Sequence, residues 1–248
     1  MMRLRIVLLM IAVVLLLPLT ALAQEGGEPA IESADVEVMS DGQAYQSYLA
    51  YPSTGGPHPA IVLIHSFNGL EEGYRTMTDH FAAEGFVVLA VGWQTFERSP
   101  SDATVQQLLT DSVAYLAERE DVDSARIGLT GFCAGGRYTM LFLPQLEAFS
   151  AGVAWYGFPN NGDPAPAAFV DQLSAPMLII HGTADRPSPI SDIYQYATAL
   201  DAVGAYFELK VYQGEPHGFM LVDGQLREDA VAQDAFQQMV SFFQRTLG

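Results

Sequence analysis

Short apolar runs of strand length recur along the chain, and they constrain its fold more than any other feature of the sequence. Their lengths suit strands that are buried on both faces, and helical patterns or loops rich in Gly and Pro separate them. Strands that alternate with helices join through right-handed crossovers into a mostly parallel sheet. We therefore expect an α/β fold with a twisted, mostly parallel sheet of about seven or eight strands and helices on both faces. The runs cover residues 59–65, 86–91, 126–130, 151–156 and 176–181.

The segments around these runs complete the pattern. Residues 36–39 and 43–51 flank a Ser-Asp-Gly turn and are typical of a β-hairpin, and residues 206–212 form a further predicted strand. The Pro- and Gly-rich residues 159–166 are expected to form a long surface loop. Apolar spacing and stop signals predict helices over residues 74–84, 105–116, 135–146, 192–200 and 228–247.

The first residues have the composition of a secretory signal peptide. Arg3 and Arg5 precede an unbroken apolar run over residues 6–17, and Ala-Leu-Ala at 21–23 is a small-x-small cleavage site. The run is short for a bilayer core of about 30 Å, although an uncleaved signal that tethers the protein to the membrane is the alternative. In both cases the folded part is expected to be exported, to a periplasm or the extracellular medium. The expected organisation is a signal peptide over 1–23, a flexible leader over 24–33 and a single domain over 34–248.

The composition excludes several classes of partner. The chain has 248 residues, with 29 Asp and Glu against 11 Lys and Arg, and a net charge of −18 at pH 7. Such a surface repels the phosphates of nucleic acids and anionic lipids, so neither is expected as a partner. We expect a monomer that acts on a small molecule. Because an exported chain with one cysteine cannot form an internal disulfide, Cys133 is either buried filler or a reactive group.

The neighbours of Cys133 favour the reactive interpretation. The sequence Gly131-Phe-Cys-Ala-Gly-Gly136 lies between an apolar strand and a predicted helix. A nucleophile at such a strand-to-helix turn is exposed, and the sharp turn leaves no room for side chains nearby. Gly131 and Gly135 would let the turn close, and Gly136 would let the helix pack on the sheet. The helix N-terminus also lowers the pKa of a thiol. The pattern predicts a nucleophile elbow with sulfur in place of the more usual serine oxygen.

Two later strand ends offer a base and a carboxylate to orient it. Asp185 closes the sequence Gly-Thr-Ala-Asp after the strand over 176–181, and His217 lies in a turn-rich loop after the strand over 206–212. An Asp before Arg-Pro commonly caps a turn, and a loop histidine is often merely exposed. Together, however, they follow the order nucleophile, acid, histidine that accompanies this kind of elbow.

These motifs resemble those of the dienelactone hydrolases, a family of the α/β-hydrolase superfamily. The resemblance implies an α/β-hydrolase fold and hydrolysis of esters or lactones through a thioester acyl-enzyme, without metal or organic cofactor. It implies Cys133 as the nucleophile, His217 as the base and Asp185 as the orienting carboxylate. It runs from about Pro59 to the C-terminus and rests on Gly131-Phe-Cys-Ala-Gly-Gly136, Trp155-Tyr-Gly157, His181-Gly-Thr-Ala-Asp185 and Pro216-His-Gly-Phe219.

The remaining site residues follow from this arrangement. The backbone N–H groups of Ala134, directly after the nucleophile, and of Phe67, after the first buried strand, are expected to bind the developing oxyanion. His65 is expected to organise the oxyanion loop rather than to act as a base. No cluster of His, Cys, Asp and Glu has the spacing of metal ligands. The side chains expected to line the substrate pocket are Ser66, Trp93, Tyr156 and Phe219.

Two departures from the family pattern bear on the substrate. The family usually carries a Glu that helps to activate the thiol, and Ser66 aligns with it here. Its enzymes for anionic dienelactones also use arginines, one of them shortly after the histidine, where this chain has none; Arg137 lies in the helix after the elbow. We therefore expect a neutral ester or lactone as substrate. The alternatives are a catalytically silent fold used as an extracytoplasmic binding protein, and thiol redox signalling, which a missing resolving cysteine disfavours.

Overall fold

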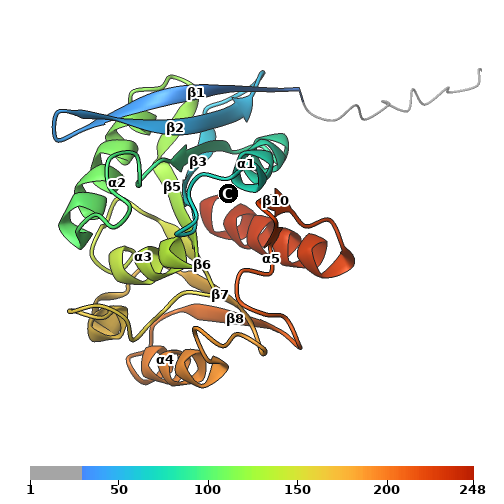
Figure 1. Ribbon diagram of the computed structural model, residues 1–248. Coiled ribbons are helices and arrows are strands. Elements are labelled where there is room, and N and C mark those ends of the chain that lie inside the picture. Colours follow the sequence, from blue (N-terminus) through green and yellow to red (C-terminus); the bar gives the residue numbers. More distant parts are fainter. Residues whose placement is uncertain (1–29) are drawn as a thin grey trace, which may run out of the picture.

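The computed structural model describes residues 30–248, so the predicted signal peptide and most of the predicted leader lie outside the described residues. One sheet of eight strands, in the order β1-β2-β4-β3-β5-β6-β7-β8, passes through the molecule (Figure 1). The strands are β1 (Ile31–Ser40), β2 (Gln43–Pro52), β3 (His58–Ile64), β4 (Val87–Val91), β5 (Val122–Phe132), β6 (Ala151–Trp155), β7 (Met177–Gly182) and β8 (Phe207–Tyr212).

The six neighbouring strands β4, β3, β5, β6, β7 and β8 are parallel. The hairpin of β1 and β2 pairs antiparallel with β4 at one edge of the sheet. The turn between these two strands is Asp41-Gly42, and both residues have positive φ, 47° and 75°. Tight hairpin turns of this kind favour that dipeptide. The mostly parallel α/β fold predicted from the sequence is therefore confirmed.

Five helices cover both faces of the sheet (Figure 1). Helices α2, α3 and α4 pack on one face and α1 and α5 on the other, and a separate cluster of buried apolar side chains lies under each group. Among residues 30–248, none of the helices has the length and apolar character needed to cross a membrane. The helices are α1 (Glu72–Ala83), α2 (Asp102–Ala117), α3 (Ala134–Phe142), α4 (Ile190–Ala202) and α5 (Ala230–Leu247).

Four features differ from the sequence predictions. Strand β1 begins at Ile31, inside the expected leader, because its first residues pair with the end of β2. Helix α3 ends at Phe142 rather than at residue 146, since Pro144 lacks the N–H that would continue it. A short 3₁₀ helix over Pro166–Gln172 follows the predicted loop. A hairpin of β9 (Leu221–Val222) and β10 (Gln225–Leu226), which the sequence analysis missed, lies between β8 and α5.

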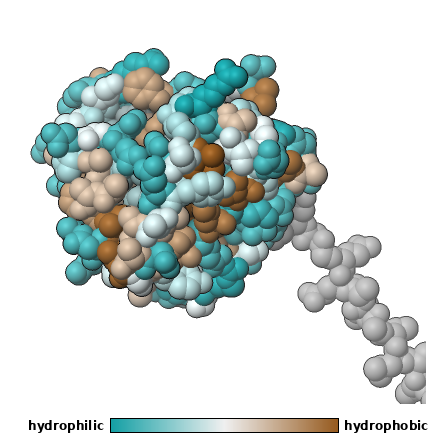
Figure 2. Space-filling model, turned by 90° about the horizontal axis from the view of Figure 1, so that it is seen from below, coloured by the Kyte–Doolittle hydropathy of each residue, from teal (hydrophilic) through white to brown (hydrophobic). Residues whose placement is uncertain are grey.

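On the face shown in Figure 2, hydrophobic residues lie together near the middle, and hydrophilic residues surround them. Among the described residues, the large apolar side chains that are exposed include Met39, Phe96 and Tyr206, which lie far apart in the sequence. Such a mixture is ordinary for a protein surface and marks no particular site.

Candidate active site

Cys133 lies at a sharp turn between β5 and α3. Its backbone has φ 59° and ψ −111°, a conformation that a residue with a side chain rarely adopts. The Cys133 N–H donates to the carbonyl of Trp155 over 3.1 Å, and the Cys133 carbonyl accepts from the N–H of Arg137 over 2.9 Å. The strained residue is thus held on both sides by the sheet and the helix, as observed at functional turns.

The glycines around Cys133 are required by close approaches of the backbone. A Cβ atom on Gly131 would lie 2.2 Å from the carbonyl oxygen of Gly135, so the turn could not close. A Cβ on Gly135 would lie 2.1 Å from the oxygen of Ile64, at the end of β3. A Cβ on Gly136 would lie 2.3 Å from the oxygen of Trp155, at the end of β6. The roles predicted for the three glycines, closing the turn and letting the helix approach the sheet, are confirmed.

Asp185 and His217 are brought together by the loops after β7 and β8. The Nδ1 atom of His217 lies 2.7 Å from Oδ2 of Asp185, whose carboxylate is buried. The other carboxylate oxygen accepts from the N–H of Ser188 over 2.8 Å. His181, at the end of β7, donates from Nε2 to the Ser188 carbonyl over 2.9 Å, so the loop that carries Asp185 is held from a second side. The carboxylate therefore has a fixed position from which to orient the imidazole.

His217 favours its protonated form. Burial of the ring opposes the charge, but the hydrogen bond to Asp185 and the interaction with Cys133 outweigh it and raise the pKa of His217 to about 9. The second ring nitrogen, Nε2, is buried and has no well-aligned hydrogen-bond partner among the described residues. Since Cys133 and His217 line the same cavity, Nε2 is the atom available for exchanging a proton with the thiol or with a substrate.

This cavity has a volume of about 420 Å³, which suits a small molecule. The predicted pocket residues Ser66 and Tyr156 line it, together with Phe67, one of the two predicted oxyanion residues. Tyr156 is almost fully buried although it lines the cavity, and this burial raises the pKa of its hydroxyl well above the ordinary value. The phenol is thus held neutral beside the nucleophile.

The other two predicted pocket residues, Trp93 and Phe219, are buried in the core and do not line the cavity. The Trp93 ring stacks on the His65 ring at 5.3 Å, and its indole N–H donates to the His65 carbonyl over 3.1 Å. Phe219 packs against the rings of Tyr156 and Tyr212 at 5.6 and 5.5 Å. The prediction was wrong for these two residues, which support the cavity wall from behind.

His65 has the structural position expected from the sequence. It is almost fully buried, and its Nδ1 lies 2.7 Å from the Ser66 carbonyl. Burial lowers the pKa of His65 to about 4, so the ring is neutral near pH 7 and donates from Nδ1 to that carbonyl. The Ser66 hydroxyl in turn accepts from the N–H of Asn68 over 3.1 Å. These bonds shape the loop that carries Phe67.

One wall of the cavity comes from α1 and from the β9–β10 hairpin, neither of which was expected there from the sequence. Tyr74 belongs to helix α1, and Glu71 directly precedes that helix. Asp223 and Gly224 form the turn of the β9–β10 hairpin. The Gly224 carbonyl accepts from the N–H of Gly73 over 2.8 Å, which joins hairpin and helix. The Asp-Gly pair after the apolar stretch Met220-Leu-Val222 is a hairpin signal that predicts this turn.

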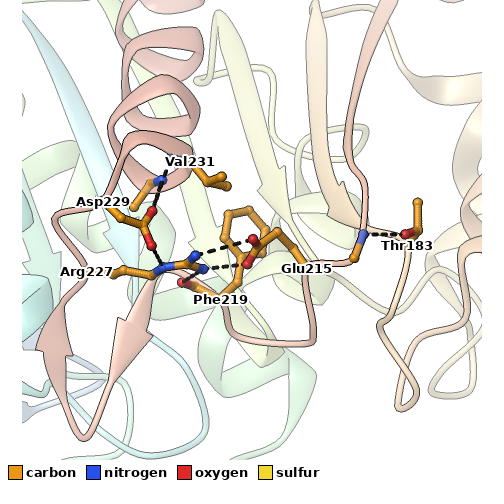
Figure 3. A network of polar contacts seen from close by, with 8 residues as sticks. Thr183, Glu215, Phe219, Arg227, Asp229 and Val231 are labelled. Carbon is orange, nitrogen blue, oxygen red and sulfur yellow. Dashed lines mark hydrogen bonds and ion pairs between the residues drawn. The ribbon is translucent and has the colours of Figure 1, made fainter.

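Two arginines near the site, Arg137 and Arg227, bind carboxylates of the protein itself. Arg137 makes two hydrogen bonds of 2.7 Å to Asp102, and its side chain does not line the cavity. Arg227 follows the hairpin and pairs with Glu215 (Figure 3). The residues that line the cavity include no Lys or Arg. Over residues 30–248, no three His, Cys, Asp or Glu side chains are grouped so as to hold a metal ion.

Comparison with known proteins identifies similar chains of one family. The model of the dienelactone hydrolase family matches residues 45–94 and 93–247. A relative from Escherichia coli (strain K12), named "Putative carboxymethylenebutenolidase", is 28% identical over 250 residues and covers 92% of each chain. A relative of the same name from Methylorubrum extorquens is 29% identical over 233 residues, covering 84% of this chain and 78% of the other.

A solved structure carries the same fold. The crystal structure from Klebsiella pneumoniae titled as that of a "Putative Dienelactone Hydrolase" superimposes with a TM-score of 0.78 at 26% identity, over 87% of this chain and 99% of the other. The α/β-hydrolase fold that the motifs imply is thereby confirmed.

Proposed function

The chain belongs to the dienelactone hydrolase family and is a carboxylic ester hydrolase of the carboxymethylenebutenolidase type, and we propose that it cleaves an ester or lactone through Cys133, His217 and Asp185. The observation that supports this most is the 2.7 Å bond between His217 and Asp185 at the cavity where Cys133 occupies a strained strand-to-helix turn. Nucleophile, base and orienting carboxylate follow three strand ends, and together they supply the groups that nucleophilic catalysis requires.

In the proposed reaction, Nε2 of His217 carries the proton while the sulfur of Cys133 attacks the ester carbonyl. The tetrahedral intermediate collapses to a thioester, and the imidazolium gives its proton to the departing alcohol. Water then attacks the thioester and loses a proton to His217, the acid leaves, and Cys133 and His217 return to their starting state. The hydrogen bond from Nδ1 to Asp185 fixes the tautomer and stabilises the charged ring throughout.

The oxyanion is proposed to accept hydrogen bonds from the N–H groups of Ala134 and Phe67. Ala134 is the first residue of α3, so its N–H has no acceptor inside the helix. The N–H of Phe67 donates to no acceptor among the described residues. Because Gly135 lets the start of α3 approach the end of β3, the two donors belong to adjoining loops.

The charge of the cavity supports a neutral substrate. Glu71 and Asp223 line it without any Lys or Arg, and the charge of His217 there is offset by its bond to Asp185, so a substrate carboxylate would meet two like charges. Arg98 is a cation close to the cavity that does not line it. Its side chain is exposed on a loop, and its guanidinium lies over the Phe67 ring, 4.7 Å from the centroid. We therefore propose an uncharged ester or lactone rather than an anionic dienelactone.

Export and a monomeric state also belong to the proposal. The signal-peptide pattern of residues 1–23 supports export, with an uncleaved anchor as the alternative. N-terminal sequencing of the protein from a fractionated cell would distinguish the two, because only cleavage leaves a chain that begins near Gln24. Size-exclusion chromatography would test the monomer.

The mechanism is tested by mass spectrometry of the protein after brief exposure to a panel of short activated esters. We expect an acyl adduct on Cys133, and no adduct and no turnover for Cys133→Ala, whose circular dichroism should match that of the unchanged protein. Cys133→Ser should be much slower, since a serine needs a stronger base than a thiol. Full turnover by Cys133→Ala would refute the mechanism, and binding of esters without turnover by the unchanged protein would favour a silent binding fold.

A further inference from the structure

Arg227 contacts both ends of the short segment that carries His217 (Figure 3). Its guanidinium pairs with the carboxylate of Glu215, two residues before the histidine. It also donates to the carbonyl oxygen of Phe219, two residues after the histidine, over 3.4 Å. A third bond joins the guanidinium to the Asp229 carboxylate at the start of α5. One side chain therefore connects the catalytic loop with a helix of the core.

The segment around His217 has few other constraints on this side. Gly214 and Gly218 have φ of 81° and 73°, and a Cβ on either would meet no atom within 4 Å. The three residues from Glu215 to His217 thus lie between two glycines that face open space, while the His217 ring packs on Tyr156 and Phe158. Backbone with few packed neighbours opens readily unless side-chain bonds hold it.

The opposite side of the segment is bound to the β7 loop. The N–H of Gly214 donates to the hydroxyl of Thr183 over 2.8 Å (Figure 3), and the N–H of Ala184 donates to the carbonyl of Glu215 over 3.0 Å. These bonds position the segment relative to Asp185, the next residue along that loop. Arg227 supplies the contact on the far side, so the backbone of Glu215 is held to the loop after β7, and its carboxylate is held through Arg227 to Asp229 at the start of α5.

The end of α5 to which Arg227 connects is itself well fixed. Asp229 accepts hydrogen bonds from the N–H groups of Val231 and Ala232, both of 3.0 Å, and so caps the helix. The buried face of α5 carries Phe242 and Phe243, which are fully buried in the core. The anchor for the catalytic loop is therefore a rigid element of the molecule.

Arg227 acts at a distance from the substrate. Neither Arg227 nor Glu215 lines the cavity with Cys133; Arg227 instead borders a separate cavity of about 800 Å³ between α1 and α5. We propose that Arg227 is a positioning residue, which holds His217 in register with Asp185 and Cys133 through its bonds to Glu215 and Phe219. The proposal rests on the proposed catalytic role of His217. Displacement of a catalytic group by about 1 Å can cost about a hundredfold in rate, so the effect is measurable.

A double-mutant cycle tests this arrangement. Arg227→Met and Glu215→Gln should each lower kcat about tenfold and leave KM within about twofold, because they move a catalytic group without touching the substrate. The double variant should lose no more than Arg227→Met alone, since the bond that Glu215→Gln removes is already absent in that variant. Arg227→Lys should recover part of kcat. Arg245→Met, which breaks the exposed pair with Glu208, is the matched control and should leave kcat unchanged.

A second measurement does not depend on turnover. The proton between Nδ1 of His217 and Asp185 should give a low-field ¹H NMR signal in the ligand-free protein, broadened or shifted upfield in Arg227→Met and unchanged in Arg245→Met. An unchanged signal and unchanged kcat in Arg227→Met, or additive losses in the cycle, would overturn the proposal. If instead His217→Ala remained fully active, the proposed function would fail, while the NMR result would still report on how Arg227 holds the ring.

Discussion

His217 and Asp185 are joined by one hydrogen bond of 2.7 Å, and the carboxylate that accepts it is buried and bonded on its other oxygen to Ser188. An Asn at position 185 would keep the shape but could present an amide N–H to Nδ1, which favours the wrong tautomer. We expect Asp185→Asn to lower kcat by about a hundredfold or more with little change in folding. The pH–rate profile should also shift, because the pKa of His217 loses its main support. An unaltered profile would separate Asp185 from catalysis.

The raised pKa of His217 makes stability depend on pH in a defined direction. The folded protein holds the proton with a pKa of about 9, against about 6.5 for an unfolded chain. The stabilisation is therefore complete below pH 6.5 and is lost as the pH rises through 9, by about 2 to 3 kcal/mol for this group. Urea unfolding at pH 6.5 and pH 9.5 measures the loss. In His217→Gln, whose side chain does not titrate, the free energy of unfolding should change less between these two pH values. An equal change in both proteins would contradict the assignment.

His65 has the opposite dependence. Its pKa of about 4 in the folded protein lies below the ordinary value, so the unfolded chain takes up the proton first. The contribution of His65 is intact above pH 6.5 and falls by about 2 to 3 kcal/mol as the pH drops to 4. His65→Asn can still donate to the Ser66 carbonyl without titrating. Its free energy of unfolding should therefore change less between pH 7 and pH 4.5 than that of the unchanged protein; a change of the same size would show that other groups dominate.

The elbow could be predicted from sequence because its constraints are local. Gly131, Gly135 and Gly136 each face a backbone oxygen at a distance that excludes any side chain, and those contacts arise within one strand-to-helix turn or at the ends of the neighbouring strands. The order of nucleophile, acid and histidine is equally visible, since each residue follows a recognisable apolar strand. Periodicity and turn chemistry carry this information directly.

The cavity wall could not be predicted in the same way. Trp93 and Phe219 are as apolar as true pocket residues, and only the packing of His65 and Tyr212 against them decides that they belong to the core. Glu71 reaches the cavity because the β9–β10 hairpin packs against α1, a contact between segments about 150 positions apart in the chain. Such long-range contacts leave no periodic signal in a single sequence.

The contact between Gly73 and the hairpin gives a further prediction. A Cβ on Gly73 would lie 2.7 Å from the backbone nitrogen of Leu226, which cannot move without displacing the hairpin. Gly73→Ala is expected to cost about 1 to 3 kcal/mol, the usual range for overpacking, and to raise KM by moving Asp223 and Gly224 at the cavity wall. Val222→Ala, at an exposed position of the same hairpin, is the control and should change neither the stability nor the KM. Thermal unfolding and ester kinetics measure both effects, and wild-type KM in Gly73→Ala would show that the hairpin does not shape the substrate site.

Glu71 and Asp223 should set the preference for substrate charge. Both carboxylates line the cavity, and Glu71 pairs with no cation among the ion pairs of the described residues. A matched pair of aryl esters, one ending in a carboxylate and one in its methyl ester, isolates the charge. The neutral ester should have the higher kcat/KM, and Glu71→Gln with Asp223→Asn should raise the relative rate of the anionic ester by about threefold to tenfold at low salt.

The control for this charge effect is Asp192→Asn, on α4 and outside the cavity, which should leave the ratio of the two rates unchanged. Added salt should narrow the difference between the two esters, because it screens charges that remain partly exposed. Equal rates for both esters in the unchanged protein would show that the carboxylates do not discriminate, without affecting the assignment of the nucleophile. A preference for the anionic ester would point to Arg98, which lies over the Phe67 ring, as the group that binds the substrate carboxylate.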